Sequence, residues 1–119
     1  MTTIKTKRIY EPKEKADGFR VLVDRLWPRG LKKEDTDFDV WMKEIAPSTG
    51  LRQWFNHDAE KWEEFKWKYI SELKQSPVTD ELATLMDKHK TVTLLYGAKD
   101  EVHNQAMVIK DFIQRVLKK

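Results

Sequence analysis

Apolar residues form two short continuous runs and one weaker alternating run along the chain. The continuous runs are Val21–Val23, within the segment Phe19–Asp24, and Leu94–Tyr96, which follows the β-branched residues Thr91–Thr93; Gly18 and Gly97 mark turns beside these segments. A short continuous apolar run is typical of a strand that is covered on both faces in a parallel sheet. The alternating run, Ile4–Tyr10, predicts a third and peripheral strand.

Segments with apolar residues three or four positions apart predict five helices, four between the second and third strands and one after the third. Their expected starts are Thr36 or Asp37, Ser48, Ala59, Thr79 and about Glu101. In the first of them, Phe38, Trp41, Met42 and Ile45 have the spacing of one helix face, and Pro47 ends the segment.

Strands separated by helices imply parallel pairing, because their connections are too long for tight hairpins. The expected fold is therefore α/β: a single three-layer domain with a small, mainly parallel sheet flanked by helices. With 119 residues the chain is long enough for one hydrophobic core, so we assign residues 1–119 to one domain. Ligands of such sheets bind beyond the carboxyl ends of the strands, and candidate residues are sought there.

Eight candidate site residues lie in the segments that follow the second and third strands. They are Asp24, Arg25, Trp27 and Arg29 in the first segment, and Tyr96, Lys99, His103 and Asn104 in the second. Because the carboxyl ends of parallel strands share one edge, we expect both segments to lie on the same rim of the sheet.

Each candidate has a possible chemical role. Arg25, Arg29 and Lys99 together suit a phosphate or carboxylate, since a guanidinium donates two parallel hydrogen bonds to an oxyanion. Asp24 and His103 are the candidates for proton transfer and so for catalysis.

Trp27 and Tyr96 are candidates for stacking on a ligand, and Arg8, Arg52 and Asn104 are further ligand-binding candidates. An alternative interpretation stays open for the rim, in which Asp24 forms ion pairs with Arg25 and Lys99 in a purely structural network. Asp100 is expected at the N-cap of the last helix, where its carboxylate would occupy N–H donors that an anion would otherwise use.

Composition narrows the classes of function. The net charge of +3 is spread along the chain and does not form the basic stripe of a duplex-DNA binder. There is no cysteine, and the longest apolar runs are only a few residues long, so we expect a cytoplasmic protein with no membrane span. Nucleotide-binding and hydrolase motifs are missing, and the three histidines are scattered, so no cofactor and no metal are expected.

Trp67 lies off the apolar stripe of the third predicted helix and is expected to be exposed. An exposed tryptophan beside basic residues suits single-stranded nucleic acid or a protein partner, but a second packing surface is the favoured explanation.

Several of these motifs together resemble a known family, the YeaO-like branch of the domain of unknown function 488 (DUF488). The resemblance rests on Lys7–Tyr10, Asp17–Gly18, the string Val23-Asp24-Arg25-Leu26-Trp27-Pro28-Arg29-Gly30, Ala46–Ser48 and Thr93–Tyr96. It extends over nearly the whole chain and implies no particular reaction. The chain departs from the pattern at Gln105, where the branch often has His, and it lacks the Cys-His-Arg element of the wider family, so a thiol mechanism is not transferred.

The leading hypothesis is a small enzyme or ligand-binding domain for an anionic small molecule, such as a nucleotide or sugar phosphate, at the strand ends. The alternative is a non-catalytic module that binds single-stranded nucleic acid or a protein.

Overall fold

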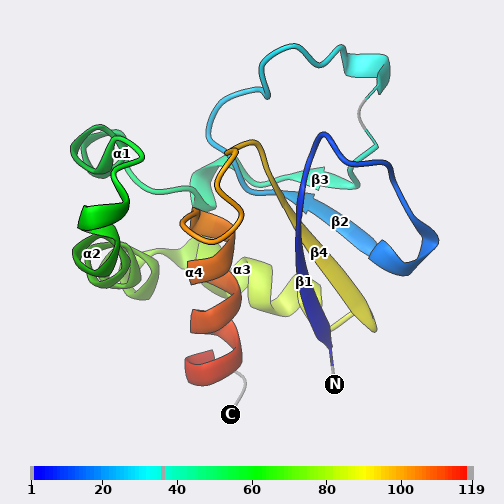
Figure 1. Cartoon of the computed structure of the whole chain (residues 1–119). Helices are drawn as coiled ribbons and strands as arrows, with labels where there is room; N and C mark the ends of the chain where they lie inside the picture. The colour runs from blue at the N-terminus through cyan, green and yellow to red at the C-terminus, as the bar shows by residue number, and fades with distance from the viewer. Residues whose placement is uncertain (1, 36, 118–119) are drawn as a thin grey trace.

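Four parallel strands form one sheet in the computed structural model, which describes residues 2–35 and 37–117. The strands are β1 (Thr3–Arg8), β2 (Phe19–Leu22), β3 (Val40–Trp41) and β4 (Thr91–Tyr96), in the spatial order β1-β4-β2-β3. All three pairings are parallel, so the carboxyl ends of the strands lie on one edge (Figure 1). The predicted parallel α/β fold is confirmed.

The four α-helices are α1 (Thr49–Phe55), α2 (Trp62–Gln75), α3 (Pro77–Met86) and α4 (Gln105–Phe112). Ser48, Ser76 and Asn104 cap α1, α3 and α4, and each side-chain oxygen accepts a hydrogen bond from a backbone N–H in the first turn. A π-helical turn, η5 (Ile113–Leu117), continues α4. None of the helices within the described ranges is long and apolar enough to cross a membrane.

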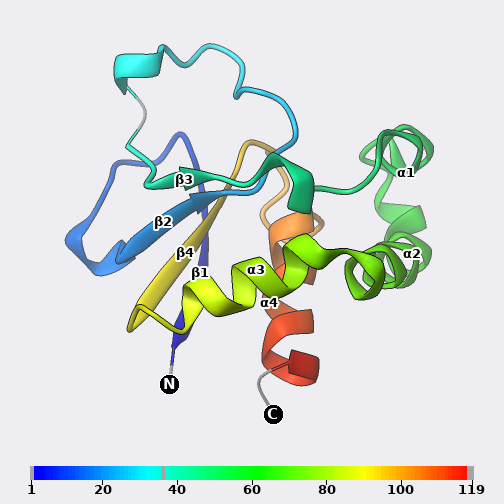
Figure 2. The same cartoon turned by 180° about the vertical axis from the view of Figure 1, so that it is seen from behind.

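The main core lies between the sheet and all four helices, which are grouped on one side of the strands in Figures 1 and 2. Its sheet side consists of alternate residues of the strands, which point to this face because side chains alternate along a strand. Fully buried members include Val21, Val23, Val92 and Leu94 from the sheet, and Leu82, Met86, Ile109 and Ile113 from the helical side.

The opposite face of the sheet is covered by loops and short 3-10 turns. Leu22 and Leu95 are fully buried there against Trp41 of β3 and against Phe38, which precedes β3. The segment between β2 and β3, blue to cyan at the top of Figure 1, supplies most of this cover. The third layer is therefore made of loops, and the α-helices form a layer on one face only.

A buried ion-pair network holds the first loop against this second face. The Arg20 guanidinium and the Asp17 carboxylate are paired and almost fully buried, and Lys7 Nζ lies 3.1 Å from Asp17 Oδ1. Burial alone would raise the pKa of Asp17, but hydrogen bonds from the Glu14 N–H, Lys7 and Arg20 lower it. Thr93 Oγ1 donates to the Asp17 carbonyl at 2.7 Å, which ties the loop to β4.

The predicted helix over Phe38–Ile45 is wrong, because this segment forms β3 and the 3-10 turn η3 (Lys43–Ile45). Its apolar side chains enter two different cores: Phe38 and Trp41 pack on the loop side of the sheet, and Met42 and Ile45 on the helix side. The backbone N–H groups of Asp39 and Met42, just before and just after β3, donate to the carbonyls of Arg20 and Leu22 in β2. These bonds take the place of helical hydrogen bonds. Of the two expected caps, Thr36 lies outside the described residues, and the Asp37 carboxylate is paired with Lys13 at 3.8 Å.

Two other helix starts differ from the prediction. α3 begins at Pro77 with Ser76 as its cap, and the Thr79 hydroxyl, buried inside the helix, donates to the Leu73 carbonyl at 2.8 Å. Proline is favoured at the first helical position because its missing N–H would have no partner there. α4 begins at Gln105, since residues 101–104 form bends before the Asn104 cap.

Candidate functional site

The candidate site lies at the carboxyl edge of the sheet, where β2 and β4 end side by side. Asp24 follows β2, and its Oδ2 accepts a hydrogen bond from the Gly97 N–H, which follows β4, at 2.8 Å. This contact joins the two segments that the sequence placed on one rim. Arg25 and Lys99 follow the same two strand ends.

The Asp24 carboxylate is fixed by donors from two elements. Besides the Gly97 N–H, the Gln105 side-chain amide at the start of α4 donates to Asp24 Oδ1. A Cβ on Gly97 would lie only 2.8 Å from Asp24 Oδ2, so glycine permits this close approach. Burial raises the pKa of Asp24, and although Gly97, Gln105 and the charge of Arg52 act in the opposite direction, the net shift is upward.

Arg52 lies on α1, and the Nε of its guanidinium has no hydrogen-bond partner. Its Nε is buried, and no described residue accepts a hydrogen bond from it or forms an ion pair with the guanidinium. Its positive charge nevertheless lowers the pKa of Asp24 against the effect of burial, which places the two groups in the same electrostatic environment. Buried polar groups in folded proteins nearly always have a hydrogen-bond partner, so an unpaired buried donor of this kind calls for an explanation.

The segment Ile45–Ser48, which precedes α1, is held by side chains from three directions. Arg25 donates to the carbonyls of Ala46 at 3.0 Å and Pro47 at 3.3 Å. Tyr69 of α2 donates its hydroxyl to the Ile45 carbonyl at 2.5 Å. Glu72 accepts hydrogen bonds from the N–H of Ser48 at 2.9 Å and from its hydroxyl at 2.6 Å. These contacts fix where α1 starts and so where Arg52 projects.

The proposed ion-pair network of Asp24 with Arg25 and Lys99 is not formed among the described residues. Asp24 has neutral donors as its hydrogen-bond partners, and Arg25 is bonded to backbone carbonyls. Lys99 is exposed. Arg25 thus supports the backbone next to the site, with two of its nitrogens already committed.

Two further candidates are also bound to the protein itself. Arg8 donates to the carbonyl of Ala98 at 2.9 Å and lies 4.9 Å from the centre of the Tyr10 ring. Asn104 is buried, caps α4, and donates to the Asp100 carbonyl at 2.9 Å. Both residues therefore shape the loop after β4.

Tyr96 is only 2% exposed, so its ring is part of the core and is not free to stack on a ligand from solvent. Burial together with the charges of Glu101 and Glu11 raises the pKa of its hydroxyl, partly offset by Arg8 and by a hydrogen bond with Asn104. At physiological pH the Tyr96 hydroxyl is a neutral group.

His103 pairs with Asp100 at the edge of the site. Its Nδ1 lies 2.8 Å from Asp100 Oδ2, and its ring meets the edge of Trp62 with 5.2 Å between ring centres. Hydrogen bonds from the His103 N–H, the His103 ring and the Val102 N–H lower the pKa of Asp100 to about 2. Asp100 therefore caps the bend at residues 101–103 and not α4, whose cap is Asn104.

Trp27 and Arg29 lie in the loop after β2. Trp27 is 37% exposed, packs edge-on against Trp41, and donates its Nε1–H to the Leu31 carbonyl at 2.8 Å. The Arg29 side chain is exposed, and within the described part of the chain it has no hydrogen-bond or ion-pair partner. Its carbonyl accepts a hydrogen bond from the Tyr10 hydroxyl at 2.8 Å, so only its backbone is anchored.

Comparison with known proteins agrees with this arrangement of motifs. The family model described as "Inactive DUF488-N3 subclade" matches residues 3–119. The chain belongs to the DUF488 family. It is 43% identical to the uncharacterized protein YeaO of Escherichia coli (strain K12) over 111 residues, which cover 93% of this chain and 96% of YeaO. No solved structure matches it.

More distant relatives occur in mycobacteria. This DUF488 protein is 36% identical over 112 residues to the uncharacterized proteins Rv3073c of Mycobacterium tuberculosis (strain ATCC 25618 / H37Rv) and Mb3100c of Mycobacterium bovis. In each case the match covers 94% of both chains. The family is thus shown over almost the full length.

Sequence reasoning missed the residues of this DUF488 site that act through neutral hydrogen bonds. Gln105 stood out only as a departure from the family pattern, and Gly97 only as the end of a strand, yet both hold Asp24. In the sequence, Tyr69 has the spacing of a core position of α2 and Glu72 that of a surface position. Nothing in this spacing indicates that the two side chains hold the start of α1.

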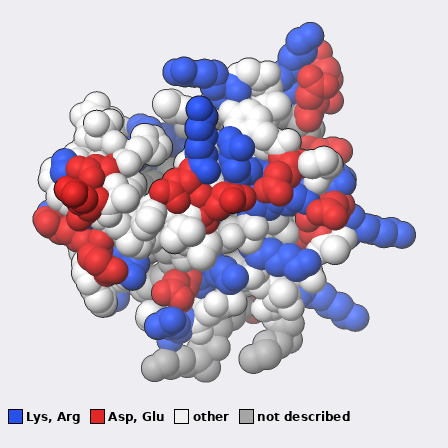
Figure 3. Space-filling view, viewed as in Figure 1, with Lys and Arg blue, Asp and Glu red and all other residues white. Residues whose placement is uncertain are grey.

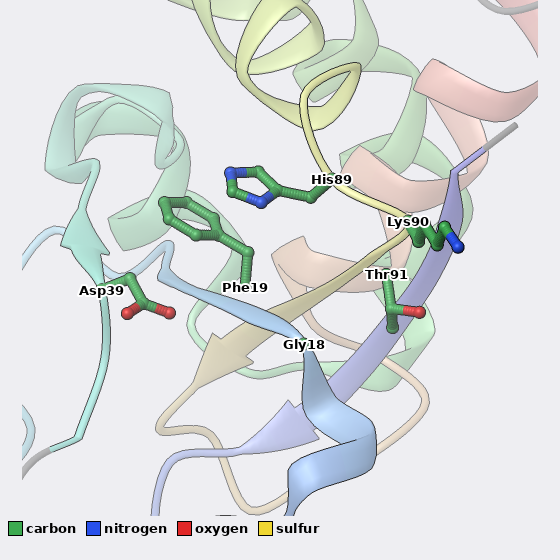
Figure 4. A pocket seen from close by; sticks show the side chains of 6 residues that line it. All are labelled: Gly18, Phe19, Asp39, His89, Lys90 and Thr91. Carbon is green, nitrogen blue, oxygen red and sulfur yellow. The ribbon is translucent and has the colours of Figure 1, made fainter.

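Two surface hollows are found among the described residues, and one of them borders the candidate site through Tyr96. One, of about 400 Å³, is at the amino-terminal edge of the sheet, opposite the candidate site; Figure 4 shows its lining, which includes the stacked rings of Phe19 and His89. The other, of about 480 Å³, runs beside β1 and is lined by Lys5, Lys7, Glu11 and Glu101 among others. No group of three or more His, Asp or Glu in the described residues is placed to hold a metal.

Charges of both signs are mixed on the face shown in Figure 3. Basic side chains gather near the top of this view, over the loops at the carboxyl ends of the strands, and a band of acidic side chains lies below them.

Proposed function

We propose that this protein is a binding domain for a small anionic molecule, such as a nucleotide or sugar phosphate, at the strand-end site. The observation that carries the proposal is the Arg52 guanidinium, whose buried Nε has no acceptor in the described protein. Leaving a buried donor unpaired costs about 1–3 kcal/mol, and an oxyanion matches the planar fork of arginine. A bound phosphate or carboxylate would relieve that cost.

Two further observations support an anionic ligand. Arg29 and Lys99 are exposed on the two loops that form the rim, and neither has a partner in the described part of the chain. Their charges add to that of Arg52 in attracting an anion to this edge.

We propose binding without turnover. The family model that matches the chain is described as inactive. Of the two candidates for proton transfer, Asp24 is held by two neutral donors, and His103 is paired with the exposed Asp100. Neither arrangement provides the nucleophile–base hydrogen bond from which acid–base or covalent catalysis starts.

A thermal-shift screen against nucleotides, sugar phosphates and carboxylates at constant ionic strength tests the proposal. A ligand at about 100 times its Kd adds about 2.7 kcal/mol to the free energy of unfolding, which raises Tm visibly in a domain of this size. Arg52→Gln should abolish the shift. The matched control is Arg115→Gln, because Arg115 is an exposed arginine on η5 that pairs with Asp111 at 3.0 Å. If no anion raises Tm, or if both variants respond alike, the proposal is wrong.

Binding of single-stranded nucleic acid has one supporting feature, the exposure of Trp67 on α2 at 66%. The lysines on either side of it are paired with glutamates of the same helix, at 3.5 Å for Lys66 and 3.6 Å for Lys68, so this face has little net positive charge. A nucleic-acid complex would weaken steeply with salt, whereas a pocket for one small anion depends on salt far less. A salt titration of any observed binding therefore separates the two functions.

A further inference from the structure

The loop after β2 makes a turn around Arg29, and side-chain hydrogen bonds fix that turn on two sides. Within it the Leu31 N–H donates to the Pro28 carbonyl at 3.4 Å. The Trp27 Nε1–H donates to the Leu31 carbonyl at 2.8 Å, and the Tyr10 hydroxyl donates to the Arg29 carbonyl at 2.8 Å. The backbone of the turn is therefore held by the aromatic side chains of Trp27 and Tyr10.

Both of these rings are partly exposed to solvent. Six large apolar side chains are exposed among the described residues, and three of them lie on or beside this turn: Tyr10, Leu26 and Trp27. Single exposed apolar side chains are normal, whereas several that gather at one place indicate a binding surface. We call the group Tyr10, Leu26, Trp27 and Arg29 the turn surface.

The turn surface carries a positive charge that the protein itself does not use. The Arg29 side chain is exposed and has no hydrogen-bond or ion-pair partner in the described part of the chain. Arg29 and Trp27 are two residues apart, so their Cα atoms are at most about 7 Å from each other. The free guanidinium can therefore reach a small ligand that rests on the indole ring.

Printed side-chain contacts join the turn surface to the strand-end site. The Trp27 ring packs edge-on against Trp41 with 5.6 Å between ring centres, and Trp41 Nε1 donates to the Asp24 carbonyl at 2.6 Å. On the other side, Arg8 lies 4.9 Å from the centre of the Tyr10 ring and donates to a backbone carbonyl of the loop after β4 at 2.9 Å. The exposed rings and the two loops of the rim are thus parts of one connected arrangement.

The charges around the turn surface favour a small anion over a long one. Glu11 follows Tyr10 in the chain, and its carboxylate accepts a hydrogen bond from the Arg8 N–H at 3.0 Å. A band of acidic side chains also lies below the basic ones of the strand-end loops in Figure 3. A nucleic-acid strand that ran across this face would meet these carboxylates, whereas a ligand with one phosphate can stay among the basic side chains.

We propose that the turn surface binds the base of a nucleotide, so that the anion recognised by this domain is a mononucleotide and not a sugar phosphate; this inference rests on the proposed function. The base stacks on the exposed part of the Trp27 indole, and Arg29 joins the other cations of the rim in binding the phosphate. An aromatic ring that is already held in place loses little freedom when a base stacks on it. A sugar phosphate has no planar ring and leaves the turn surface uncovered.

Uridine monophosphate and dihydrouridine monophosphate are matched probes for this stacking. They carry the same ribose and phosphate, but only the uracil base is planar and unsaturated. We expect calorimetric titration of the wild-type protein at constant ionic strength to show about fivefold or more tighter binding of uridine monophosphate, which is the contribution of a base stacked on an aromatic side chain. Ribose phosphate, which has no base, should bind about as weakly as the dihydro compound.

Trp27→Leu removes the ring and keeps an apolar side chain. In this variant the ratio of the two nucleotide affinities should fall towards one, while ribose phosphate still binds. The matched control is Trp67→Leu, because Trp67 is an exposed tryptophan on α2, and this variant should keep the wild-type ratio. Circular dichroism shows whether each variant is folded. If Trp27→Leu does not fold, the ratio measured with the wild-type protein decides alone.

The outcomes separate this inference from the function on which it rests. If the wild-type protein binds ribose phosphate and both nucleotides equally, or if Trp27→Leu keeps the preference, the stacking site is wrong while the anion site stands. If a single-stranded oligonucleotide of uridines binds much more tightly than uridine monophosphate, the ligand is a nucleic-acid strand and the assignment to a mononucleotide is wrong. If none of these compounds binds, both proposals are wrong.

Discussion

At the scale of single residues, Asp24 shows how a half-buried carboxyl group is held without an ion-pair partner among the described residues. Neutral donors from the loop after β4 and from α4 supply its hydrogen bonds, and the positive charge of Arg52, which lowers its pKa, forms no ion pair with it among the described residues. Neutral donors offset only part of the cost of burying the charge, which is why the pKa of Asp24 stays raised.

This raised pKa makes the stability of the protein depend on pH. The pKa of Asp24 is higher in the folded chain than its ordinary value of 3.8, so the folded protein binds this proton more tightly than the unfolded chain does. The resulting contribution to the free energy of unfolding is fully present below pH 3.8 and is lost as the pH rises through the raised pKa. Asp24→Asn lacks this loss and should gain stability relative to wild type as the pH rises from 3.8 through the raised pKa of Asp24. Urea unfolding across this range checks the sign. A difference between the two proteins that stays constant with pH would contradict it.

Arg29 and Arg8 differ in what their side chains hold. Arg29→Ala should change the free energy of unfolding by under about 0.5 kcal/mol, because its side chain has no partner in the described structure. Arg8→Ala should cost about 1.5–3 kcal/mol, since a charged donor to the Ala98 carbonyl is lost. If Arg29 serves the anion, Arg29→Ala also weakens phosphate-monoester binding by about 1.5–3 kcal/mol. Melting and binding curves of both variants test this, and a large loss of stability with unchanged binding for Arg29→Ala would assign it to the scaffold.

The sequence identified the types of residue at the site better than their partners. Asp24 and Arg52 were both candidates; Asp24 follows β2 at the predicted edge, and the charge of Arg52 on α1 lowers the pKa of Asp24. Arg8, Arg25 and Asn104 were expected to hold a ligand, and their side chains bind nearby backbone groups. An arginine suits a carbonyl as well as a phosphate, so residue type and strand-end position alone do not distinguish the two uses.

At the scale of elements, the contacts around residues 45–48 connect α1 and α2 to the loop after β2. Tyr69 lies at the centre of this arrangement, because its buried hydroxyl meets the Ile45 carbonyl. Through these contacts the packing of α2 determines where α1, and with it Arg52, is placed.

Removing that hydroxyl should destabilise the protein. Tyr69→Phe leaves the Ile45 carbonyl without its buried donor, and we expect a loss of about 1–3 kcal/mol in the free energy of unfolding. Tyr10→Phe is the matched control, because the Tyr10 hydroxyl also donates to a backbone carbonyl, but Tyr10 is 41% exposed and water can replace it. Urea unfolding of both variants makes the comparison. Equal effects would mean that the buried bond has no special weight.

The strands with continuous apolar runs could be predicted from the sequence. The segment around β3, whose side chains enter two different cores, could not. β4 has the predicted bounds Thr91–Tyr96, since a strand covered on both faces is rich in apolar and β-branched residues on both of them. Phe38–Ile45 has helical spacing, yet Val40 pairs with Val21, and the flanking side chains enter two cores. Periodicity assumes a single buried face, so an edge strand between two cores imitates a helix in the sequence.

At the scale of the whole molecule, one sheet separates two apolar clusters that the chain builds from distant segments. The larger cluster combines residues from Ile4 to Ile113, and the smaller one joins Ile9, Leu22 and Leu95 to the loop before β3. Because β2 and β4 contribute side chains to both, neither cluster can open without disturbing the strands that support the other.

We therefore expect residues 1–119 to unfold as one cooperative domain. Trp54 and Trp62 pack on the helix side, while Trp27 and Trp41 pack on the loop side, so tryptophan fluorescence reports on both layers. Its thermal transition should coincide with the loss of far-ultraviolet circular dichroism, and the calorimetric and van't Hoff enthalpies should agree at roughly 80 kcal/mol for a chain of this length. A fluorescence transition that precedes the loss of helix, or a van't Hoff enthalpy well below the calorimetric one, would show that the loop layer opens separately and that the strand-end site loses one of its walls before the fold is lost.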